Sequence, residues 1–347
     1  MHVLVITIRC SITPSILCIK ITNLLGIFAI AKILISNHPL NIGIVVKTTG
    51  SWHTVKSGKE LIKCRLKGTF RTQSMRNTNP IAVGDQVMYE ITDKETGTIT
   101  KIHERKNYII RKATNLSRET QIMAANVDQV MLMFTLGFPE TPLEFVDRFL
   151  ISAEAYHIRC ILLINKVDLY GKETIPWLEE VRKIYEYAGY MVIDMSVSCG
   201  INTEKVYALM QNKLTLIAGN SGVGKSSLIN FLCPGIHLKT NDISWYHLSG
   251  KHTTTYPEMI EITDGTFVID SPGIRGFGLT DLNRNEIALY FTDIFKLSKN
   301  CQFYNCTHIH EPNCAVIESC KTGILHESRY RSYFNIFNDA NRKYRIR

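Results

Sequence analysis

Between residues 41 and 112, short apolar runs alternate with polar turns that contain glycine, aspartate and asparagine. The runs mostly alternate apolar with polar side chains and read IVVK, WHTV, LIKCRL, QVMYEI and TITKI. A period of two is typical of strands that bury one face, and the hairpin-like spacing favours pairing between neighbours. This pattern predicts a small β-barrel of the OB type, the class that binds oligonucleotides, over residues 41–112.

From residue 113 the pattern changes to strands alternating with helices. Strand-like runs and helical patterns follow one another as VDQVMLMFTL, PLEFVDRFLISAEAY, CILLINK, IPWLEEVRKIYEYAG, YMVIDMS, LTLIA, SSLINFL and TFVID. Such alternation predicts a parallel sheet covered by helices on both faces, here over residues 113–281. Residues 282–347 have a helical and loop-like pattern, and the basic tail from 328 predicts an amphipathic helix with Arg and Lys on one side.

The first 40 residues are apolar and contain no acidic residue. The run 21–35 is 15 residues long, which is shorter than the ~20 residues needed to span a bilayer. The charged start and the cleavage site of a signal peptide are not evident. We therefore expect residues 1–40 to be an extension outside the functional fold, and we expect no stable membrane association.

Basic residues concentrate towards both ends of the chain, which has a formal net charge of +9. Residues 41–112 contain 14 Lys or Arg against 6 Asp or Glu, and residues 321–347 contain 7 against 2, so the centre is acidic. This asymmetry suggests that the terminal domains meet a polyanion, although ordinary solvated cations are the alternative. The ten cysteines are too scattered for a small disulfide scaffold and favour a reducing, cytoplasmic compartment.

GNSGVGKSS, at residues 219–227, fits the phosphate-binding pattern G-x-x-x-x-G-K-[ST]. It stands between an apolar strand and a helix, where backbone N–H groups and the helix dipole favour phosphate. In this pattern Lys225 would neutralise phosphate charge and Ser226 would ligate Mg²⁺. The candidate nucleotide-binding residues here are Gly219, Asn220, Ser221, Gly222, Val223, Gly224, Lys225, Ser226 and Ser227.

Asn165, Lys166 and Asp168 form Asn-Lys-x-Asp at the end of a buried strand, where α/β sheets bind ligands. The Asp168 carboxylate can accept the N1–H and N2–H donors of guanine, which adenine lacks. Asn165 would hold the loop and approach the base O6, and Lys166 would lie along the base plane. Ser196 and Ser198 follow the next strand and are weaker candidates for a base contact.

D-x-x-G at residues 270–273 follows the strand TFVID. Asp270 can hold Mg²⁺ through water and Gly273 can donate its N–H to a γ-phosphate. In GKHTTT, Thr253 or Thr254 can complete the Mg²⁺ shell. Small GTPases often place a glutamine after this motif to orient water, but residue 274 is isoleucine, so His252 is a candidate for that role and a bound partner is the alternative.

The order of these motifs is unusual, because the guanine motif precedes the phosphate loop. Packing fixes which strands are neighbours and not where a chain begins, so this order predicts a circularly permuted GTPase. The segment after Gly273 then leads directly into the C-terminal domain. We hypothesise that GTP orders residues 250–280 and thereby reorients that domain.

The C-terminal domain contains C-x4-C-x-H-x5-C, formed by Cys301, Cys306, His308 and Cys314. Three thiolates and one imidazole make a complete tetrahedral ligand set for a structural Zn²⁺, with no open position for catalysis. His310 is a competing ligand, and Cys320 is a weaker one.

The sequence resembles the ribosome small subunit-dependent GTPase A family, the circularly permuted GTPases of bacterial 30S assembly. The resemblance rests on NKVDL, GNSGVGKSSLIN, GKHTTT, DSPGIRGFGL, CQFYNCTHIHEPNCAV and, in the barrel, GIVVKTTGSW, NPIAVGD and RKNYIIR. It covers residues 42–337 in the family's domain order. It implies an OB domain, a permuted GTPase domain and a helical domain with zinc on the four residues given above.

The sequence therefore predicts a cytoplasmic, monomeric, Mg²⁺-dependent GTPase with one structural Zn²⁺. The resemblance implies a role in late maturation of the small (30S) ribosomal subunit, with the subunit and its rRNA as partners and GTP hydrolysis stimulated by the subunit. The alternative is an RNA-binding assembly chaperone in which nucleotide is mainly structural.

Overall fold

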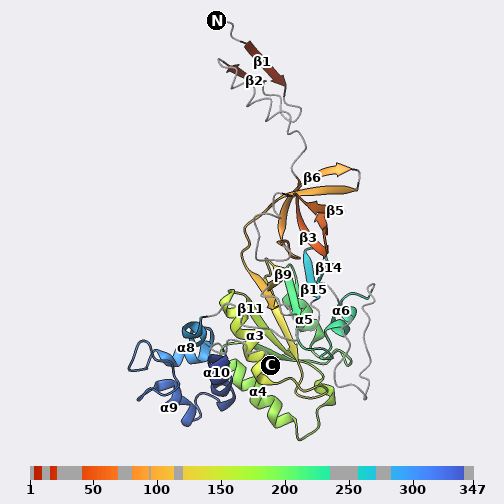
Figure 1. Ribbon diagram of the computed structural model, residues 1–347. Coiled ribbons are helices and arrows are strands. Elements are labelled where there is room, and N and C mark those ends of the chain that lie inside the picture. The colour runs from red at the N-terminus through yellow and green to blue at the C-terminus, as the bar shows by residue number, and fades with distance from the viewer. Residues whose placement is uncertain are drawn as a thin grey trace, which may run out of the picture.

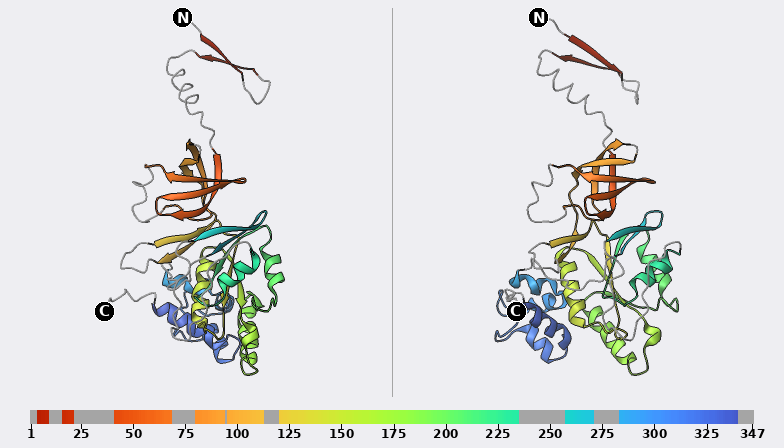
Figure 2. Two further views of the ribbon diagram at one scale, coloured as in Figure 1. Left: turned by 90° about the vertical axis from the view of Figure 1, so that its right-hand side faces the viewer. Right: turned by 45° about the vertical axis from the view of Figure 1, so that its right-hand side comes forward.

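Figure 1 shows the computed structural model, in which a β-barrel, a central α/β domain and a helical C-terminal domain follow one another along the chain. The structure describes residues 4–9, 16–21, 41–68, 80–93, 95–112, 120–234, 257–270 and 283–339. Strands β1 (Leu4–Arg9) and β2 (Ile16–Ile21) form a separate antiparallel pair that lies apart from the other elements in all ribbon views (Figures 1 and 2). Among the described residues, none of the helices combines the length and the apolar character that crossing a membrane requires.

The predicted N-terminal barrel is confirmed, and it consists of β3 (Asn41–Thr49), β4 (Trp52–Ser57), β5 (Glu60–Leu66), β6 (Gln86–Asp93) and β7 (Thr96–Ile102). The strand order is β3-β4-β5-β7-β6, and pairing between β3 and β6 closes it. Its core contains Val45, Val55, Cys64, Val87 and Ile99, among others. These residues are the apolar positions of the alternating pattern, which explains why the sequence indicated a closed barrel.

Strands β8 (Tyr108–Lys112) and β9 (Thr120–Ala125) form an antiparallel pair between the barrel and the central domain. The domain boundary predicted at residues 112 and 113 lies between these two paired strands. The pair therefore joins the two predicted domains, and a bridge from Val83 to Ala124 ties it to the barrel side.

The central domain contains the predicted parallel sheet, with strands β10 (Gln129–Phe134), β11 (Arg159–Ile164), β12 (Met191–Asp194), β13 (Leu214–Ala218), β14 (Glu258–Thr263) and β15 (Thr266–Asp270). The order is β12-β11-β10-β13-β15-β14, and only β14 is antiparallel to its neighbour within this part of the sheet. The helices are α3 (Leu143–Ala155), α4 (Ile175–Tyr187), α5 (Thr203–Met210) and α6 (Lys225–Leu232), and a short 3-10 turn, η1, covers Val167–Leu169.

Both faces of this sheet are buried, which explains the continuous apolar runs in its strands. In β10, Leu132 and Phe134 belong to one apolar cluster, whereas Met131 and Met133 belong to the cluster on the other face. A parallel strand covered by helices on both sides has no solvent-facing positions. The periodicity of apolar residues therefore does not distinguish the two faces of the strand, although the continuous apolar run does indicate a strand.

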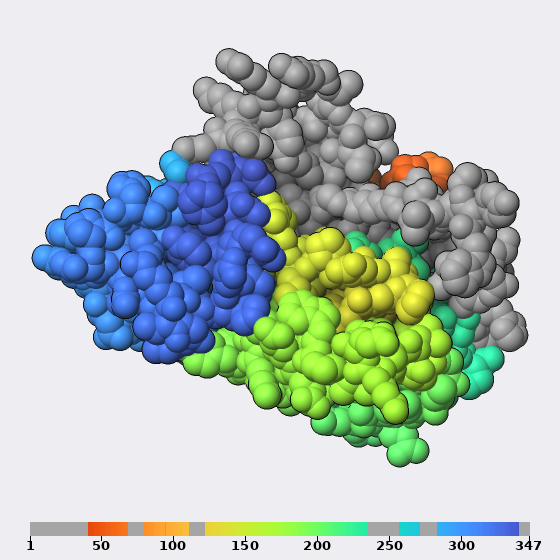
Figure 3. All heavy atoms as spheres, turned by 90° about the horizontal axis from the view of Figure 1, so that it is seen from below, coloured from red at the N-terminus to blue at the C-terminus, as the bar shows by residue number. Residues whose placement is uncertain are grey.

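The C-terminal domain contains η2 (Arg284–Glu286), α7 (Ile287–Tyr290), α8 (Thr292–Ser298), α9 (Ala315–Lys321) and α10 (Glu327–Asp339). Its core includes Ile151 of α3, so the domain packs on the central domain, and Figure 3 shows its blue atoms beside the yellow-green atoms of that domain. The expected basic face of the last helix is wrong in one respect. Arg329 does not face solvent. It is buried against the carboxylates of Asp147 and Asp293, where it joins the last helix to its neighbours.

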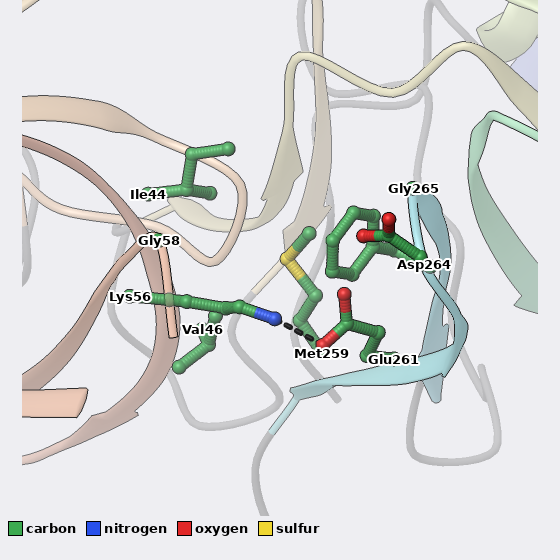
Figure 4. A pocket seen from close by; sticks show the side chains of 9 residues that line it. Ile44, Val46, Lys56, Gly58, Met259, Glu261, Asp264 and Gly265 are labelled. Atoms are coloured by element: carbon green, nitrogen blue, oxygen red, sulfur yellow. Dashed lines mark hydrogen bonds and ion pairs between the residues drawn. The ribbon is translucent and has the colours of Figure 1, made fainter. Parts of the chain in front are cut away.

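Strand β14 also joins the central sheet to the barrel. Glu258 is the register partner of Lys47 in β3, and Lys47 Nζ lies 2.9 Å from Glu258 Oε1. A second ion pair joins Lys56 to Glu261, at the edge of a cavity of about 240 Å³ between β3, β4 and the β14–β15 hairpin (Figure 4). This cavity contains none of the predicted nucleotide-binding residues.

Candidate functional site

The predicted nucleotide-binding residues follow neighbouring parallel strands. The base loop (residues 165–170) follows β11, the serine loop (196–198) lies just beyond β12, the phosphate loop (219–226) follows β13, and Asp270 ends β15. Parallel strands present their carboxyl ends at one edge of a sheet, which is where α/β proteins bind ligands. The transposed order in sequence therefore does not separate the motifs in space.

The phosphate loop has the backbone that its glycines permit. Gly219, Gly222 and Gly224 have φ angles of +147°, +83° and +108°, a region that side chains disfavour. A Cβ atom at Gly219 would lie 2.1 Å from the Met133 carbonyl oxygen, and one at Gly224 would lie 2.4 Å from Asn165 Nδ2. The loop therefore approaches both β10 and the base loop closely because it contains glycine at these positions.

Lys225 begins helix α6 and folds back into the phosphate loop. Its Nζ donates to the carbonyl oxygens of Gly219, at 2.9 Å, and Asn220, at 2.7 Å. Burial lowers the pKa of Lys225 to about 8, and the Asp270 carboxylate partly offsets this effect. An anion beside the ammonium would favour its charged form, so this lysine is suited to hold phosphate.

Three loops are joined by the side chain of Asn165. This buried amide donates from Nδ2 to the Val223 carbonyl of the phosphate loop at 2.8 Å, and its Oδ1 accepts from the Val197 N–H of the serine loop at 3.2 Å. The expectation that Asn165 holds the loop agrees with this geometry. Its amide is engaged by both loops and thus fixes the distance between the base and phosphate sides.

Asp168 and the serine loop lie together at the outer end of the site. Ser198 Oγ donates to Asp168 Oδ2 at 3.3 Å, and the Ser196 and Ser198 hydroxyls are 3.0 Å apart. Asp168 is exposed, as a carboxylate that accepts hydrogen bonds from a base must be before binding. The two weaker base candidates are therefore adjacent to the stronger one.

Two further residues of the base loop complete its structure. Lys166 has a left-handed backbone with φ of +65°, and burial lowers the pKa of its ammonium, an effect that Asp168 partly offsets. The hydroxyl of Tyr170 donates to the Asn165 carbonyl at 2.8 Å and accepts from the Leu136 N–H at 2.8 Å. Sequence reasoning missed Tyr170, because no motif signals a contact that depends on the neighbouring strand.

Asp270 is buried at the end of β15, and its register partner is Ile217 of β13, the strand that precedes the phosphate loop. This position places the carboxylate on the phosphate side, where a Mg²⁺-binding aspartate is needed. Thr253, Thr254, His252 and Gly273 lie outside the described residues, so their roles stay predictions.

The four predicted metal ligands of the C-terminal domain lie together. One ligand atom each from Cys301, Cys306, His308 and Cys314 falls within a group whose members are at most 4.8 Å apart. Cys301 Sγ and Cys314 Sγ are 3.9 Å apart, near the separation of about 3.8 Å expected for two thiolates at 2.3 Å from a tetrahedral Zn²⁺. His310 and Cys320 are outside this group, so the geometry favours the predicted set over both competitors.

Glu311 shapes the turn between the last two of these ligands, and sequence reasoning missed it. Its carboxylate accepts from the N–H groups of Thr307 at 2.8 Å, Ile309 at 3.1 Å and His310 at 3.3 Å, and from the Thr307 hydroxyl at 2.5 Å. Burial alone would raise the pKa of Glu311, but these hydrogen bonds outweigh it and lower the pKa to about 2. The turn is thus organised around an ionised carboxylate.

Comparison with protein families gives two matches. The RsgA N-terminal domain matches residues 42–99, and the RsgA GTPase matches residues 102–280. The chain is 46% identical over 305 residues to the small ribosomal subunit biogenesis GTPase RsgA 2 of Bacteroides thetaiotaomicron, covering 87% of this chain and 98% of the relative. It is likewise 46% identical over 309 residues to the small ribosomal subunit biogenesis GTPase RsgA of Christiangramia forsetii, covering 88% and 98%.

Two solved structures have the same fold. YjeQ from Thermotoga maritima superposes with a TM-score of 0.68 at 32% identity, covering 86% of this chain and 98% of that protein. YloQ, described as a circularly permuted GTPase, superposes with a TM-score of 0.67 at 30% identity, covering 90% and 99%. The predicted permutation is confirmed by this likeness together with the order of the strands and loops.

Proposed function

Because this chain belongs to the RsgA GTPase family, we propose that it hydrolyses GTP to GDP and phosphate during late maturation of the small ribosomal subunit, with stimulation by the bound subunit. One observation supports the nucleotide site most directly. The Asn165 amide connects the base, serine and phosphate loops through hydrogen bonds of 2.8 and 3.2 Å. Motifs in transposed order thus form one site with a guanine end and a phosphate end.

The residues divide into base, phosphate and metal functions. Asp168, with Ser198 beside it, accepts the guanine N–H donors, and Lys166 lies along the base. Lys225 and the N–H groups of the phosphate loop bind the β- and γ-phosphates. Ser226, and Asp270 through water, would hold a Mg²⁺ ion, which would neutralise phosphate charge. Thr254, Gly273 and His252 keep the roles predicted above.

We assign a structural Zn²⁺ to Cys301, Cys306, His308 and Cys314, because three sulfur atoms and one imidazole nitrogen provide a closed tetrahedral donor set. Such a site stabilises the loop between α8 and α9, where the described part of the chain has little secondary structure. Metal analysis of the purified chain should find about one zinc per chain, and substitution of Cys306 by serine should reduce this content.

The barrel has a surface suited to rRNA. Along β5 and just beyond it, exposed Lys63, Arg65 and Lys67 alternate with buried or partly buried positions and so lie on one face. Arg65 is the cross-strand partner of Trp52, and its guanidinium lies 4.1 Å from the centroid of that ring. Cations that bind phosphate beside an aromatic platform are typical of OB surfaces that bind nucleic acid. We propose that this face contacts rRNA while the protein acts as a monomer in the cytoplasm.

The decisive experiment measures GTP hydrolysis with and without purified small ribosomal subunits, with ATP and large subunits as controls. We expect hydrolysis to be slow alone and faster with small subunits and GTP only. Lys225→Met keeps the length of the side chain but removes the ammonium, and it should abolish the stimulated reaction. Binding to small subunits without faster hydrolysis would instead support the RNA-binding chaperone and contradict this proposal.

A further inference from the structure

The loop between β10 and α3, residues 135–141, belongs to none of the motifs described above. It nevertheless leaves the sheet between the base loop and the phosphate loop. In the strand order β12-β11-β10-β13-β15, β10 lies between the strand that ends at the base loop and the strand that ends at the phosphate loop. Its C-terminal end faces the same edge as theirs, because all three strands are parallel. A nucleotide bound to both loops would pass this β10–α3 loop at its sugar.

On the base side, the β10–α3 loop is bonded to two residues of the base loop. Lys166 Nζ donates to the Phe138 carbonyl oxygen at 2.5 Å, and the Tyr170 hydroxyl accepts from the Leu136 N–H at 2.8 Å. Because the Lys166 stem is expected to follow the base plane, its ammonium end marks the passage from base to sugar. Phe138 lies at that end.

On the phosphate side, the same loop approaches the phosphate loop closely. A Cβ atom at Gly222 would lie 3.4 Å from Pro139 Cδ. The loop is held in this position internally, since Thr135 Oγ1 donates to the Pro139 carbonyl at 2.5 Å and the Thr141 backbone N–H donates to the Thr135 carbonyl at 2.9 Å. It is therefore a fixed wall that spans the distance between the base and phosphate ends.

Phe138 is unusual in two independent respects. The residue is 56% exposed, and its backbone has a φ angle of +56°. Single exposed apolar residues are ordinary, but a bulky residue in the left-handed region is uncommon and is found more often at ligand sites. An aromatic ring that leaves the core at the edge of a nucleotide site is well placed to cover an apolar face of a ligand.

We propose that the β10–α3 loop forms the sugar-facing wall of the nucleotide site and that Phe138 packs on the nucleoside. This inference rests on the proposed function, because it requires a guanine nucleotide between Asp168 and Lys225. The contact is with the nucleoside, which GDP and GTP share. It should therefore contribute equally to the binding of both, in contrast to the phosphate contacts of Lys225.

The test measures dissociation of radiolabelled GDP and of a radiolabelled non-hydrolysable GTP analogue from the full chain. Phe138→Ala should accelerate both by about tenfold, the order of magnitude for loss of one aromatic stacking contact. Phe138→Leu should retain most of the affinity, because an aliphatic side chain still covers the nucleoside. Tyr187→Ala, which removes a 49% exposed aromatic ring from α4, is the matched control and should not change either rate.

Phe138→Gly distinguishes the effect of losing the ring from the effect of relieving backbone strain, since glycine adopts a positive φ readily. We expect it to release nucleotide as fast as Phe138→Ala. Tighter binding than in the unsubstituted chain would show that only backbone strain matters and would overturn the proposal. Dissociation from Phe138→Ala within twofold of the unsubstituted chain would overturn it as well. Failure of the unsubstituted chain to bind guanine nucleotide would overturn the proposed function together with this inference.

Discussion

Substitution of Arg329 by methionine tests how the C-terminal domain is attached to the central domain. Arg329 of α10 is 1% exposed. Its Nη1 lies 2.5 Å from Asp147 Oδ1 on α3, and its Nε and Nη2 lie 2.8 and 2.9 Å from the two carboxylate oxygens of Asp293 on α8. One guanidinium therefore connects three helices from two domains.

The expected cost follows from what the substitution leaves behind. Burial raises the pKa of Asp147, whereas at Asp293 the Arg329 charge and several hydrogen bonds outweigh burial and lower the pKa. Arg329 thus stabilises the ionised form of Asp293, and methionine would leave this carboxylate buried without a counter-charge. Breaking a buried ion pair in this way costs about 3–5 kcal/mol, whereas replacing the whole group by well-packed apolar residues of similar volume is often neutral.

Native-state hydrogen exchange of the α10 amides measures this cost as the local free energy of opening. The matched control is Arg148→Met. Arg148 also joins α3 to α10, by an ion pair to Asp339 at 2.5 Å, but its side chain is 23% exposed. An exposed pair contributes only about 0–1 kcal/mol. Equal effects of the two substitutions would refute the reasoning. Adding Asp147→Asn and Asp293→Asn to Arg329→Met should recover at least half of the loss.

Three further predictions concern the site and the terminal domains. Asp168→Asn should lower affinity for GTP relative to xanthosine triphosphate by about a hundredfold or more, because the base donors lose their acceptor; an unchanged ratio in competition binding would contradict the guanine assignment. Glu311→Gln should release zinc faster than the exposed control Glu318→Gln in a chelator assay, since a neutral amide accepts the turn's hydrogen bonds less strongly; equal rates would refute this. Replacing Lys63 and Arg65 by alanine should weaken small-subunit binding. It should also reduce the steepness of the plot of log affinity against log salt concentration by about 2, and an unchanged slope would exclude both residues as phosphate contacts.

Local patterns in the sequence were sufficient for most of the fold. The barrel strands bury alternate residues, so their period was visible, and the phosphate loop carries its own constraints in Gly219 and Gly224. The four zinc ligands were also accessible, because they occupy one short segment in which thiols and imidazole are the chemically suitable donors. In each case the residues that determine the structure are neighbours in sequence.

Contacts between distant segments were not accessible in this way. Arg329 and Asp147 are 182 residues apart, and a lone arginine in a basic tail gives no sign that it is buried. The double role of Asn165 depends on Val223, 58 residues away, and became visible only when the loops were placed side by side. The β10–α3 loop was missed for the same reason, since its position between two motif-bearing strands is a property of sheet order.

The buried charge cluster also bears on how nucleotide state is transmitted. The hypothesis from the sequence was that residues 250–280 reorient the C-terminal domain, but Arg329 fixes that domain to α3. The β14–β15 hairpin, by contrast, ends at Asp270 and meets the barrel through Lys47 and Glu258. The β14–β15 hairpin thus connects the phosphate side of the site to the barrel through exposed ion pairs, which are weak enough to rearrange.

We therefore expect hydrogen exchange on the small subunit to differ between GDP and a GTP analogue in β3 and β4, while α10 remains unchanged. A helix held by buried ion pairs should keep one position in both states, whereas a contact worth about 0–1 kcal/mol per pair can change its population with the nucleotide. Glu258→Gln should diminish the difference in β3 by removing one pair. A nucleotide-dependent change confined to α10 would contradict this argument and would favour the C-terminal domain as the element that responds.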